Sequence, residues 1–195
     1  MDLNADFWDQ RYQDETTGWD LGEVSPPIKA YIDQIDDKAI SILIPGGGNA
    51  YEAEYLFRKG FHNVFVIDLS ETALRNIKSR IPDFPAEQLL NGNFFELDRT
   101  FDLILEQTFF CAIHPDLRND YVTKMNRLLA VKGKLAGVLF NVPLYTDRPP
   151  FGGSKSEYIK RFKRFFNILL MEKAHNSHES RIGRELFFIL EKKSN

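Results

Sequence analysis

Three consecutive glycines, Gly46, Gly47 and Gly48, follow a hydrophobic run and lead directly into a helical pattern. Glycines at such a place let a ligand approach the backbone closely. Asp68, with Leu69 beside it, ends the next hydrophobic run, twenty residues after Gly48. An acidic side chain there can accept hydrogen bonds from both hydroxyl groups of a ribose. These residues predict a nucleoside site; a tight turn near an unrelated aspartate is the alternative.

The identity of the nucleoside depends on the residue three positions after Gly48. A dinucleotide fingerprint has Gly or Ala there, but this chain has Tyr51. We therefore expect a ligand with an amino-acid group and a ribose but no pyrophosphate, and S-adenosylmethionine fits, with its carboxylate near the helix N-terminus. Asn93 and Phe94, in "NGNFFEL", are expected to bind the adenine amine and to cover the adenine ring. A turn with an aromatic core residue is the alternative for this pair.

The elements that must position these residues alternate between strands and helices. Strand candidates lie at 40–44, 63–68, 88–90, 101–106, 134–141, 167–174 and 184–191, and helical patterns separate most of them. This alternation predicts an α/β fold with a mainly parallel, doubly wound, Rossmann-like sheet. The last two candidates are too close for a crossover helix, so we expect them to form an antiparallel pair.

Local signals predict where several helices begin and what they carry. Ser25 before a proline is a good N-cap, and Ser154 with Glu157 forms a capping box. Leu129 is expected to continue the apolar face of the helix that starts near 117. Phe166 is expected on the apolar face of the last helix.

Composition excludes several classes of protein. The chain has 195 residues, of which 43% are hydrophobic and 27% charged, as expected for one domain with a sizeable core. Its net charge of -3 argues against a nucleic-acid partner. No apolar run is long enough for a membrane span, no secretory signal is evident, and the single cysteine gives no metal signature. We expect a cytoplasmic monomer that acts on a small molecule, without a membrane partner or a metal.

Five motifs make the chain similar to a known family. It resembles the thiopurine methyltransferase-like branch of class I S-adenosylmethionine-dependent methyltransferases, and within it the plant-type halide and thiol methyltransferases. The resemblance covers nearly the whole chain, and its motifs read "FWDQRYQDETTGWDLG", "IPGGG", "VFVIDLSETAL", "FDLILEQTFFCAIHP" and "DRPPFGG". The resemblance implies a seven-stranded sheet with a C-terminal antiparallel strand, S-adenosylmethionine as donor and S-adenosylhomocysteine as product. It also implies a lid segment at 1–36 on a core at 37–195.

The resemblance assigns further residues to the donor. Trp8, Tyr12 and Trp19 match an N-terminal aromatic set that closes over the donor, whose sulfonium is a cation that aromatic faces attract by about 0.5–2 kcal/mol. Docking of an N-terminal helix on the core is the alternative for the two tryptophans. Gln107 matches a position that lines the donor in relatives and is often Arg or Tyr there.

The resemblance also implies an acceptor pocket. Phe109, Phe110 and Phe151 match its walls, although each also suits an ordinary core. The implied reaction is in-line transfer of a methyl group to a small soft nucleophile: a thiol, hydrosulfide, halide or thiocyanate. Such acceptors need orientation and exclusion of water rather than a base, so we assign no catalytic residue.

Two rival functions and several polar residues complete the sequence interpretation. One rival function is that of an NAD(P)-dependent oxidoreductase, which would explain the glycines but not the N-terminal aromatic residues. The other is that of a noncatalytic nucleoside-binding regulator. We expect His114 to have a structural or solvated position in its loop, with removal of a thiol proton as the alternative. Cys111 is expected to be a small buried hydrophobic residue. We expect His175, His178 and Arg181 to form a solvated turn, with steering of an anionic acceptor as the alternative.

Overall fold

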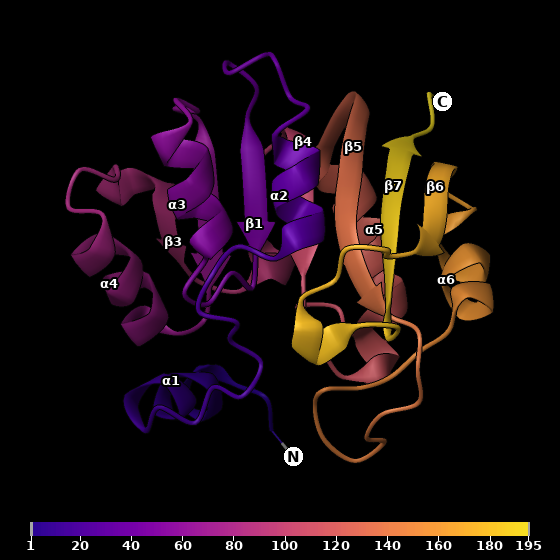
Figure 1. Cartoon of the computed structure of the whole chain (residues 1–195), viewed down its shortest axis with the longest axis horizontal. Helices are drawn as coiled ribbons and strands as arrows, with labels where there is room; N and C mark the ends of the chain where they lie inside the picture. Colours follow the sequence, from indigo (N-terminus) through magenta and orange to yellow (C-terminus); the bar gives the residue numbers. More distant parts are fainter. Residues whose placement is uncertain (1, 195) are drawn as a thin grey trace.

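Residues 2–194, which this computed structural model describes, fold around a seven-stranded sheet in the order β3-β2-β1-β4-β5-β7-β6 (Figure 1). Strand β7 is antiparallel to both β5 and β6, and the other neighbouring pairs are parallel. This arrangement confirms the predicted class I fold and its terminal antiparallel pair. The strands are β1 (Ile42–Pro45), β2 (Val64–Asp68), β3 (Leu89–Asn91), β4 (Phe101–Gln107), β5 (Leu129–Phe140), β6 (Phe166–Lys173) and β7 (Glu185–Lys192).

Helices cover both faces of this sheet. On one face the apolar sides of α2, α3 and α4 share a core cluster with alternate residues of β1, β2 and β4. On the other face α5 and α6 pack in the same way. The helices are α1 (Ala5–Gln13), α2 (Pro26–Ile32), α3 (Tyr51–Arg58), α4 (Glu71–Arg80), α5 (Arg118–Leu128) and α6 (Lys155–Phe162), with 3₁₀ turns η1 (Ala86–Gln88), η2 (Phe94–Glu96), η3 (Pro115–Leu117) and η4 (Glu179–Arg181).

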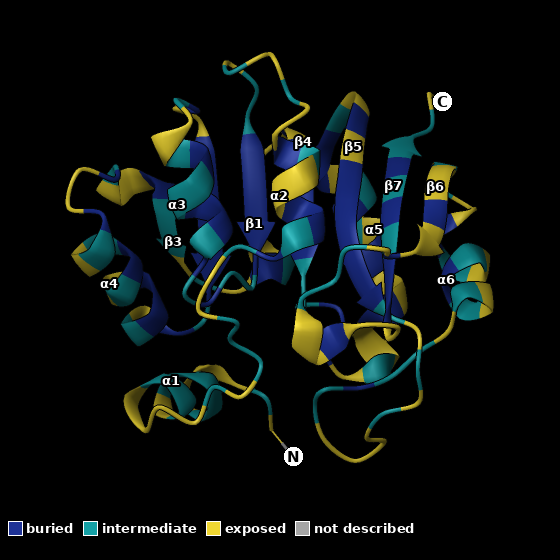
Figure 2. Cartoon of the chain, in the orientation of Figure 1, coloured by how far each residue is buried: buried dark blue, intermediate teal, exposed yellow. Residues whose placement is uncertain are grey.

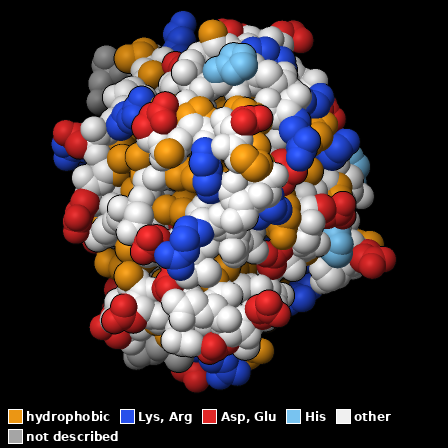
Figure 3. Space-filling model, turned by 90° about the vertical axis from the view of Figure 1, so that its left-hand side faces the viewer, with side chains coloured by type: hydrophobic (Ala, Val, Ile, Leu, Met, Phe, Trp, Pro, Cys, Tyr) orange, Lys and Arg blue, Asp and Glu red, His pale blue; other side chains and the backbone are white. Residues whose placement is uncertain are grey.

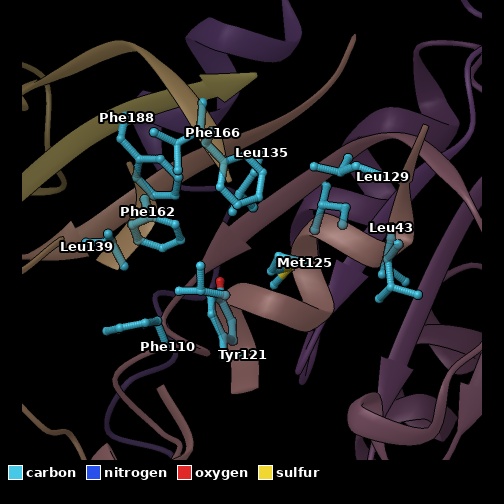
Figure 4. Packing of buried hydrophobic residues seen from close by; sticks show 14 of the residues in the cluster. Leu43, Phe110, Tyr121, Met125, Leu129, Leu135, Leu139, Phe162, Phe166 and Phe188 are labelled. Atoms are coloured by element: carbon cyan, nitrogen blue, oxygen red, sulfur yellow. The ribbon is translucent and has the colours of Figure 1, made fainter. Parts of the chain in front are cut away.

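The alternation of side chains along β1 explains the two layers. Ile42 and Ile44 enter the cluster that α2 and α3 cover, whereas Leu43 between them enters the opposite one. On the α5 side, Tyr121 and Phe162 belong to a tightly packed aromatic and aliphatic group (Figure 4). Because both faces are buried, β1 and β2 are apolar throughout except for Asp68 at the end of β2.

The structure corrects two expectations about element boundaries. Leu129 is not helical: it begins β5 and pairs with Phe101, and a register shift follows before Leu103 pairs with Lys134. Burial at the start of the strand outweighs the helical pattern of the sequence. Phe166 begins β6, beyond the end of α6, and is buried in the same cluster as Phe162.

Both predicted N-cap positions are confirmed, but their hydrogen bonds differ from expectation. Ser25 is the N-cap of α2 with a proline at N1, but its side chain makes no capping hydrogen bond, because its hydroxyl donates to the Gln107 side chain instead. The Ser154 hydroxyl does accept the Glu157 amide at 3.3 Å. The Glu157 carboxylate completes no box, since it binds Arg118 and Arg161.

The N-terminal segment (residues 2–24) lies against the carboxyl-terminal edge of the sheet. Helix α1 buries none of the residues of Ala5–Gln13 and is largely teal and yellow in Figure 2. The loop at 141–154 and η4 lie at the same edge (Figure 1). Segments from the beginning, middle and end of the chain therefore meet where β1, β2 and β4 end.

The surface has no single-sign charged patch on the face shown in Figure 3, where acidic and basic side chains are interspersed with apolar ones. No helix within residues 2–194 has both the length and the apolar character needed to cross a membrane.

Candidate active site

Each glycine of the loop after β1 is needed for a different structural reason. Gly46 (φ +56°) and Gly48 (φ +55°) adopt the left-handed conformation, in which other residues are strained. A Cβ at Gly46 would lie 2.1 Å from the Phe109 ring, and one at Gly48 would lie 2.1 Å from the Tyr12 hydroxyl. A Cβ at Gly47 would meet the Val66 side chain at 2.6 Å, so this glycine serves close packing of the sheet.

Asp68 joins the glycine loop to the start of α4. Its carboxylate accepts the amide of Gly48 at 2.8 Å and the amide of Ser70 at 2.8 Å. The side chain is buried, and this burial raises its pKa, although hydrogen bonds from the backbone oppose the shift. The carboxylate thus lies at the carboxyl end of β2, where the sequence predicted it, and it contacts the backbone of the glycine loop and of the residue that precedes α4.

Aromatic residues of the N-terminal segment lie over this loop. The indole Nε1 of Trp19 donates to the Tyr12 hydroxyl at 3.3 Å, and the two rings meet edge to face. Trp8 is edge-on to Trp19 with 5.6 Å between centroids. Burial raises the pKa of Tyr12, and the nearby Asp68 carboxylate raises it further, so the hydroxyl stays protonated. The three predicted aromatic residues therefore form one group against Gly48.

Asp9 docks this segment on the core. Its carboxylate accepts the Ser70 hydroxyl at 2.7 Å, and the amide and hydroxyl of Thr72 at 2.8 and 3.1 Å. Burial alone would raise its pKa, but these hydrogen bonds prevail and lower the pKa to about 2. An acid at the N-terminus of α4 is also favoured by the helix dipole. Asp9 is therefore the anchor of α1.

A cleft of about 480 Å³, open to solvent, lies between the N-terminal segment and the glycine loop. Three carboxylates, Asp20, Glu23 and Glu52, line it with Tyr12 and Trp19. Burial raises the pKa of Glu52 to about 7. Acids and aromatic faces together favour a cationic group in this cleft.

Gln107 contributes an unpaired donor to the same cleft. The Ser25 hydroxyl donates to its Oε1 at 2.8 Å, which fixes the amide. Its Nε2 is buried and has no hydrogen-bond partner within residues 2–194. A buried N–H without a partner is costly, so a ligand oxygen is a natural acceptor. Together, the acids and the Gln107 amide suit a zwitterionic amino-acid group, which the donor carries.

The predicted adenine side lies beyond β3. Asn93 is exposed, and its Oδ1 accepts the Phe95 amide at 3.0 Å. Phe94 is buried, and its ring meets the Phe109 ring edge to face at 5.2 Å. The Leu69 carbonyl accepts the Asn91 side chain at 3.1 Å. The adenine roles of Asn93 and Phe94 remain predictions.

The predicted acceptor walls are brought together after β4. Phe109 is half-buried against Gly46, as described above. Phe110 is buried and stacks edge to face with Tyr121 and Tyr158. Phe151 is buried, and its amide donates to the Cys111 carbonyl at 2.7 Å. The 141–154 loop and the loop after β4 are thus joined. We call Phe109, Phe110 and Phe151 the aromatic wall; of these three, Phe109 contacts the glycine loop, whereas Phe110 and Phe151 are buried in the core.

Glu106 holds the beginning of that wall. Its fully buried carboxylate accepts the amides of Phe109 and Phe110 at 2.8 and 2.9 Å and the Tyr121 hydroxyl. Burial raises its pKa to about 7, although the hydrogen bonds act in the opposite direction. These three donors engage both carboxylate oxygens, which makes Glu106 a support for the loop.

The other polar residues have structural surroundings. Cys111 is buried, which raises its pKa to about 12, as expected for an inert thiol. His114 is half-exposed and accepts the Asp116 amide at 3.3 Å. The solvated turn was a wrong expectation for Arg181, whose side chain is 7% exposed and pairs with Glu185. No group of three His, Cys, Asp or Glu residues within 2–194 is placed to hold a metal ion.

The sequence matches a known family. A model of the family Thiopurine S-methyltransferase matches residues 3–192. The chain belongs to this family. It is accordingly an S-adenosylmethionine-dependent methyltransferase, as the sequence predicted. The left-handed glycines, the Asp68 carboxylate and the unpaired Gln107 amide fit this cofactor. Family membership gives no support to the oxidoreductase or to the noncatalytic regulator.

Curated relatives and solved structures agree with the family. The chain is 32% identical over 158 residues to probable thiol methyltransferase 2 of Arabidopsis thaliana, covering 78% of this chain and 70% of that one. It is 28% identical over 152 residues to thiocyanate methyltransferase 1 of the same plant, covering 74% and 65%. The fold is similar to that of a Burkholderia thailandensis 1,6-didemethyltoxoflavin-N1-methyltransferase with bound S-adenosylhomocysteine. That similarity has a TM-score of 0.80 at 17% identity and covers 97% and 87% of the two chains.

Sequence reasoning missed Asp9 and Glu52 in this methyltransferase and gave Ser25 and Arg181 other roles. Asp9 and Ser25 join residues from different elements, and Arg181 reaches Trp19 across most of the chain. Glu52 lines the cleft and carried a usable signal, since it is an acid in the first turn after the glycine loop and lies on the buried side of α3. The contacts of the other three carried no signal, because their partners are set by tertiary structure.

Proposed function

We propose that this enzyme transfers the methyl group of S-adenosylmethionine to a small soft nucleophile: a thiol, hydrosulfide, halide or thiocyanate. The observation that carries the proposal is the half-buried Phe109 ring against Gly46, at the beginning of the aromatic wall. Sequence identity to a probable thiol methyltransferase and to a thiocyanate methyltransferase supports this acceptor class. We expect the working form to be a cytoplasmic monomer without nucleic-acid or membrane partners.

Residues around the cleft are assigned to the donor. Asp68 is proposed to bind the ribose hydroxyls, with Leu69 at the same edge, while Asn93 and Phe94 bind the adenine. At the other end, Glu52 is proposed to bind the ammonium group and Gln107 the carboxylate of the donor. The bound donor supplies a methyl group activated by a sulfonium, so no protein group has to activate it.

The protein then supplies orientation and a water-poor site. We propose that the segment at 1–36 is a lid over the core at 37–195, with Trp8, Tyr12 and Trp19 over the sulfonium and the three phenylalanines around the acceptor. Orientation can provide effective molarities of about 10⁵–10⁸ M. A general base typically contributes about 10²–10⁴-fold. Orientation is therefore sufficient when the acceptor arrives as an anion.

A thiol fits this arrangement because its pKa lies within reach of neutral pH. A thiolate, iodide or thiocyanate needs no proton removed within the site. Among the described residues, Glu106 is the buried acid nearest in sequence to the aromatic wall, and its oxygens are held by Phe109, Phe110 and Tyr121. This engagement supports a structural role for Glu106 and a reaction without a dedicated base.

Binding of S-adenosylhomocysteine tests the donor half of the proposal. The wild type is expected to bind it and not NAD. Asp68→Ala should weaken binding by about 1.5–3 kcal/mol, the contribution of hydrogen bonds to a charged group. Calorimetric titration measures both, with circular dichroism as a control for folding. An unchanged Kd in folded Asp68→Ala would remove the ribose role.

A methyl-transfer screen over thiols, hydrosulfide, iodide and thiocyanate tests the acceptor half. Turnover of at least one class is expected. His114→Ala should slow thiol methylation by less than about tenfold, far below the loss of a general base. Turnover of iodide or thiocyanate should not change in this variant. No turnover of any soft nucleophile by a protein that binds S-adenosylhomocysteine would show that the acceptor class is wrong.

A further inference from the structure

Arg181 is a buried cation that none of the assigned roles uses. It ends η4, in the connection between β6 and β7, and its side chain is 7% exposed. One guanidinium nitrogen lies 3.4 Å from the Glu185 carboxylate, which is 3% exposed. Another donates to the main-chain carbonyl of Trp19 at 2.5 Å. The guanidinium also lies 5.6 Å from the centroid of the Phe140 ring.

This arrangement joins two parts of the chain that share no element of the sheet. Glu185 belongs to β7 and is fixed by pairing with β5, so Arg181 has a rigid support. Trp19 lies in the N-terminal segment, 162 residues away in sequence. An arginine can make both contacts at once because its planar guanidinium carries several donors in a fixed geometry. A lysine in the same place would offer one compact charge.

The contact with the Trp19 carbonyl fixes a residue that lines the donor cleft. The Trp19 indole lines the donor cleft and donates to the Tyr12 hydroxyl, which lies against Gly48. Since α1 buries none of its residues in Ala5–Gln13, the segment cannot be held by a core of its own. Asp9 fixes one end on α4. The other end, which carries the cleft wall, is held by Arg181 at Trp19 and by the Asn49 side chain, which donates to Asp20.

We propose that Arg181 is a positioning residue for the donor: it holds Trp19 in place, so that the N-terminal segment closes the cleft. The inference rests on the proposed donor site. The guanidinium touches Trp19 and Glu185, and its charge also lowers the pKa of Glu52 in the cleft, against the larger effect of burial. A merely structural Arg181 would stabilise the β6–β7 connection and leave the donor affinity unchanged.

The tryptophans provide a direct readout. The chain has two, Trp8 and Trp19, and both lie in the N-terminal segment. Intrinsic tryptophan fluorescence therefore reports on this segment alone. The experiment measures the emission maximum, the Kd for S-adenosylhomocysteine and the thermal midpoint for wild type and Arg181→Gln. Arg184→Gln is the matched control, because Arg184 lies in the same connection, is exposed and also faces the Phe140 ring.

Arg181→Gln is expected to raise the Kd by about 10- to 100-fold, the loss associated with a hydrogen bond from a charged group. Its emission should shift to longer wavelength, and the KM for the donor should rise with a smaller change in kcat. Arg184→Gln should match the wild type in all three. Arg181→Lys should restore the pair with Glu185 and recover only part of the affinity.

A double variant covers the case in which Arg181→Gln does not fold. Arg181→Gln with Glu185→Gln removes both buried charges, so neither is left alone. It should keep the weakened donor binding and the shifted emission. Wild-type Kd and emission in either folded variant would overturn the inference, even if the thermal midpoint fell. Failure of the wild type to bind S-adenosylhomocysteine would instead contradict the proposed function.

Discussion

At the scale of residues, the carboxyl groups of Glu106 and Asp9 have different surroundings. Glu106 is fully buried, and its oxygens receive two backbone amides and the Tyr121 hydroxyl. Asp9 is partly exposed and surrounded by donors from Ser70 and Thr72. Burial therefore dominates for Glu106 and raises its pKa to about 7, whereas hydrogen bonds dominate for Asp9 and lower its pKa to about 2. The same chemical group thus has opposite pH responses.

The pH dependence of stability follows for Glu106. Its pKa is 4.5 without the fold and about 7 within it, so the folded state binds the proton more tightly. The protonated Glu106 side chain therefore stabilises the fold fully below the pKa of the unfolded state, and this stabilisation is lost as the pH rises through the pKa of the folded state. Glu106→Gln keeps the shape and an acceptor for the two amides. In the wild type, the free energy of unfolding should decline by about 3 kcal/mol between about pH 4.5 and 8, and the Glu106→Gln variant should lack this decline.

Urea unfolding at a series of pH values measures this decline. Glu87→Gln, at an exposed position in η1, is the control and should keep the wild-type profile. If Glu106→Gln showed the same slope as the wild type, the proton would not be coupled to folding at this residue.

Residues at strand ends were predictable, and residues with distant partners were not. Gly46, Gly48 and Asp68 follow apolar runs, so the general rule for parallel sheets was enough to place them at one edge. Glu106 ends a run in the same way, but its burial depends on Tyr121 from α5 and on the turn of the chain after it. No local pattern encodes that contact.

At the scale of elements, the loop at 141–154 is fixed by α5. Arg118 opens this helix with a side chain that is 4% exposed, and it donates to the Gly152 carbonyl at 2.8 Å. It also pairs with Glu157 of α6 at 3.0 Å and lies 4.7 Å from the Phe110 ring centroid. Arg118 therefore connects both sides of the aromatic wall, including Phe151 next to Gly152.

Arg118→Met is expected to loosen the acceptor wall and leave the donor site intact. The KM for the acceptor should rise by about tenfold or more, since one charged hydrogen bond is lost. The Kd for S-adenosylhomocysteine should change less than about twofold, because no donor-cleft residue is touched. Glu157 keeps Arg161 as a partner, so stability should fall by only about 2 kcal/mol.

Steady-state kinetics, calorimetric titration and urea unfolding separate these effects. Arg161→Gln is the matched control: it also pairs with Glu157 but does not reach the 141–154 loop. Equal losses of donor and acceptor affinity in Arg118→Met would show that the wall and the donor cleft are not independent.

Element types were read correctly from the sequence, and the errors lie at junctions. The period of the apolar residues gave each strand and helix of the core. The start of β5 at Leu129 was missed because the residues that follow the helical pattern pair with β4 across a register shift. Ser25 was predicted correctly as an N-cap, but its hydroxyl has a tertiary partner, Gln107, in place of the capping hydrogen bond. Local propensity fails where a neighbouring segment offers a better contact.

At the scale of the whole molecule, the N-terminal segment should be separable from the fold. Deletion of residues 1–19 is expected to leave a folded sheet, since α1 buries none of the residues of Ala5–Gln13. Loss of Tyr12 and Trp19 should weaken binding of S-adenosylhomocysteine at least about tenfold, because two walls of the cleft disappear, and S-adenosylmethionine should lose more through the cation–π part. Circular dichroism and titration measure the two properties. Normal binding by the truncated chain would show that the segment only packs.

The contact between Trp19 and Arg181 also sets an order of events during synthesis. The ribosome releases the chain from its N-terminus, so Trp19 emerges long before Arg181. Closing so long a loop has a large entropic cost, which the late strands β5 and β7 must first offset. An incomplete chain that ends after β4 therefore carries the glycine loop and Asp68 but lacks the second anchor of Trp19. If Arg181 positions Trp19 as proposed, the full affinity for the methyl donor is reached only when the last strand of the sheet is in place.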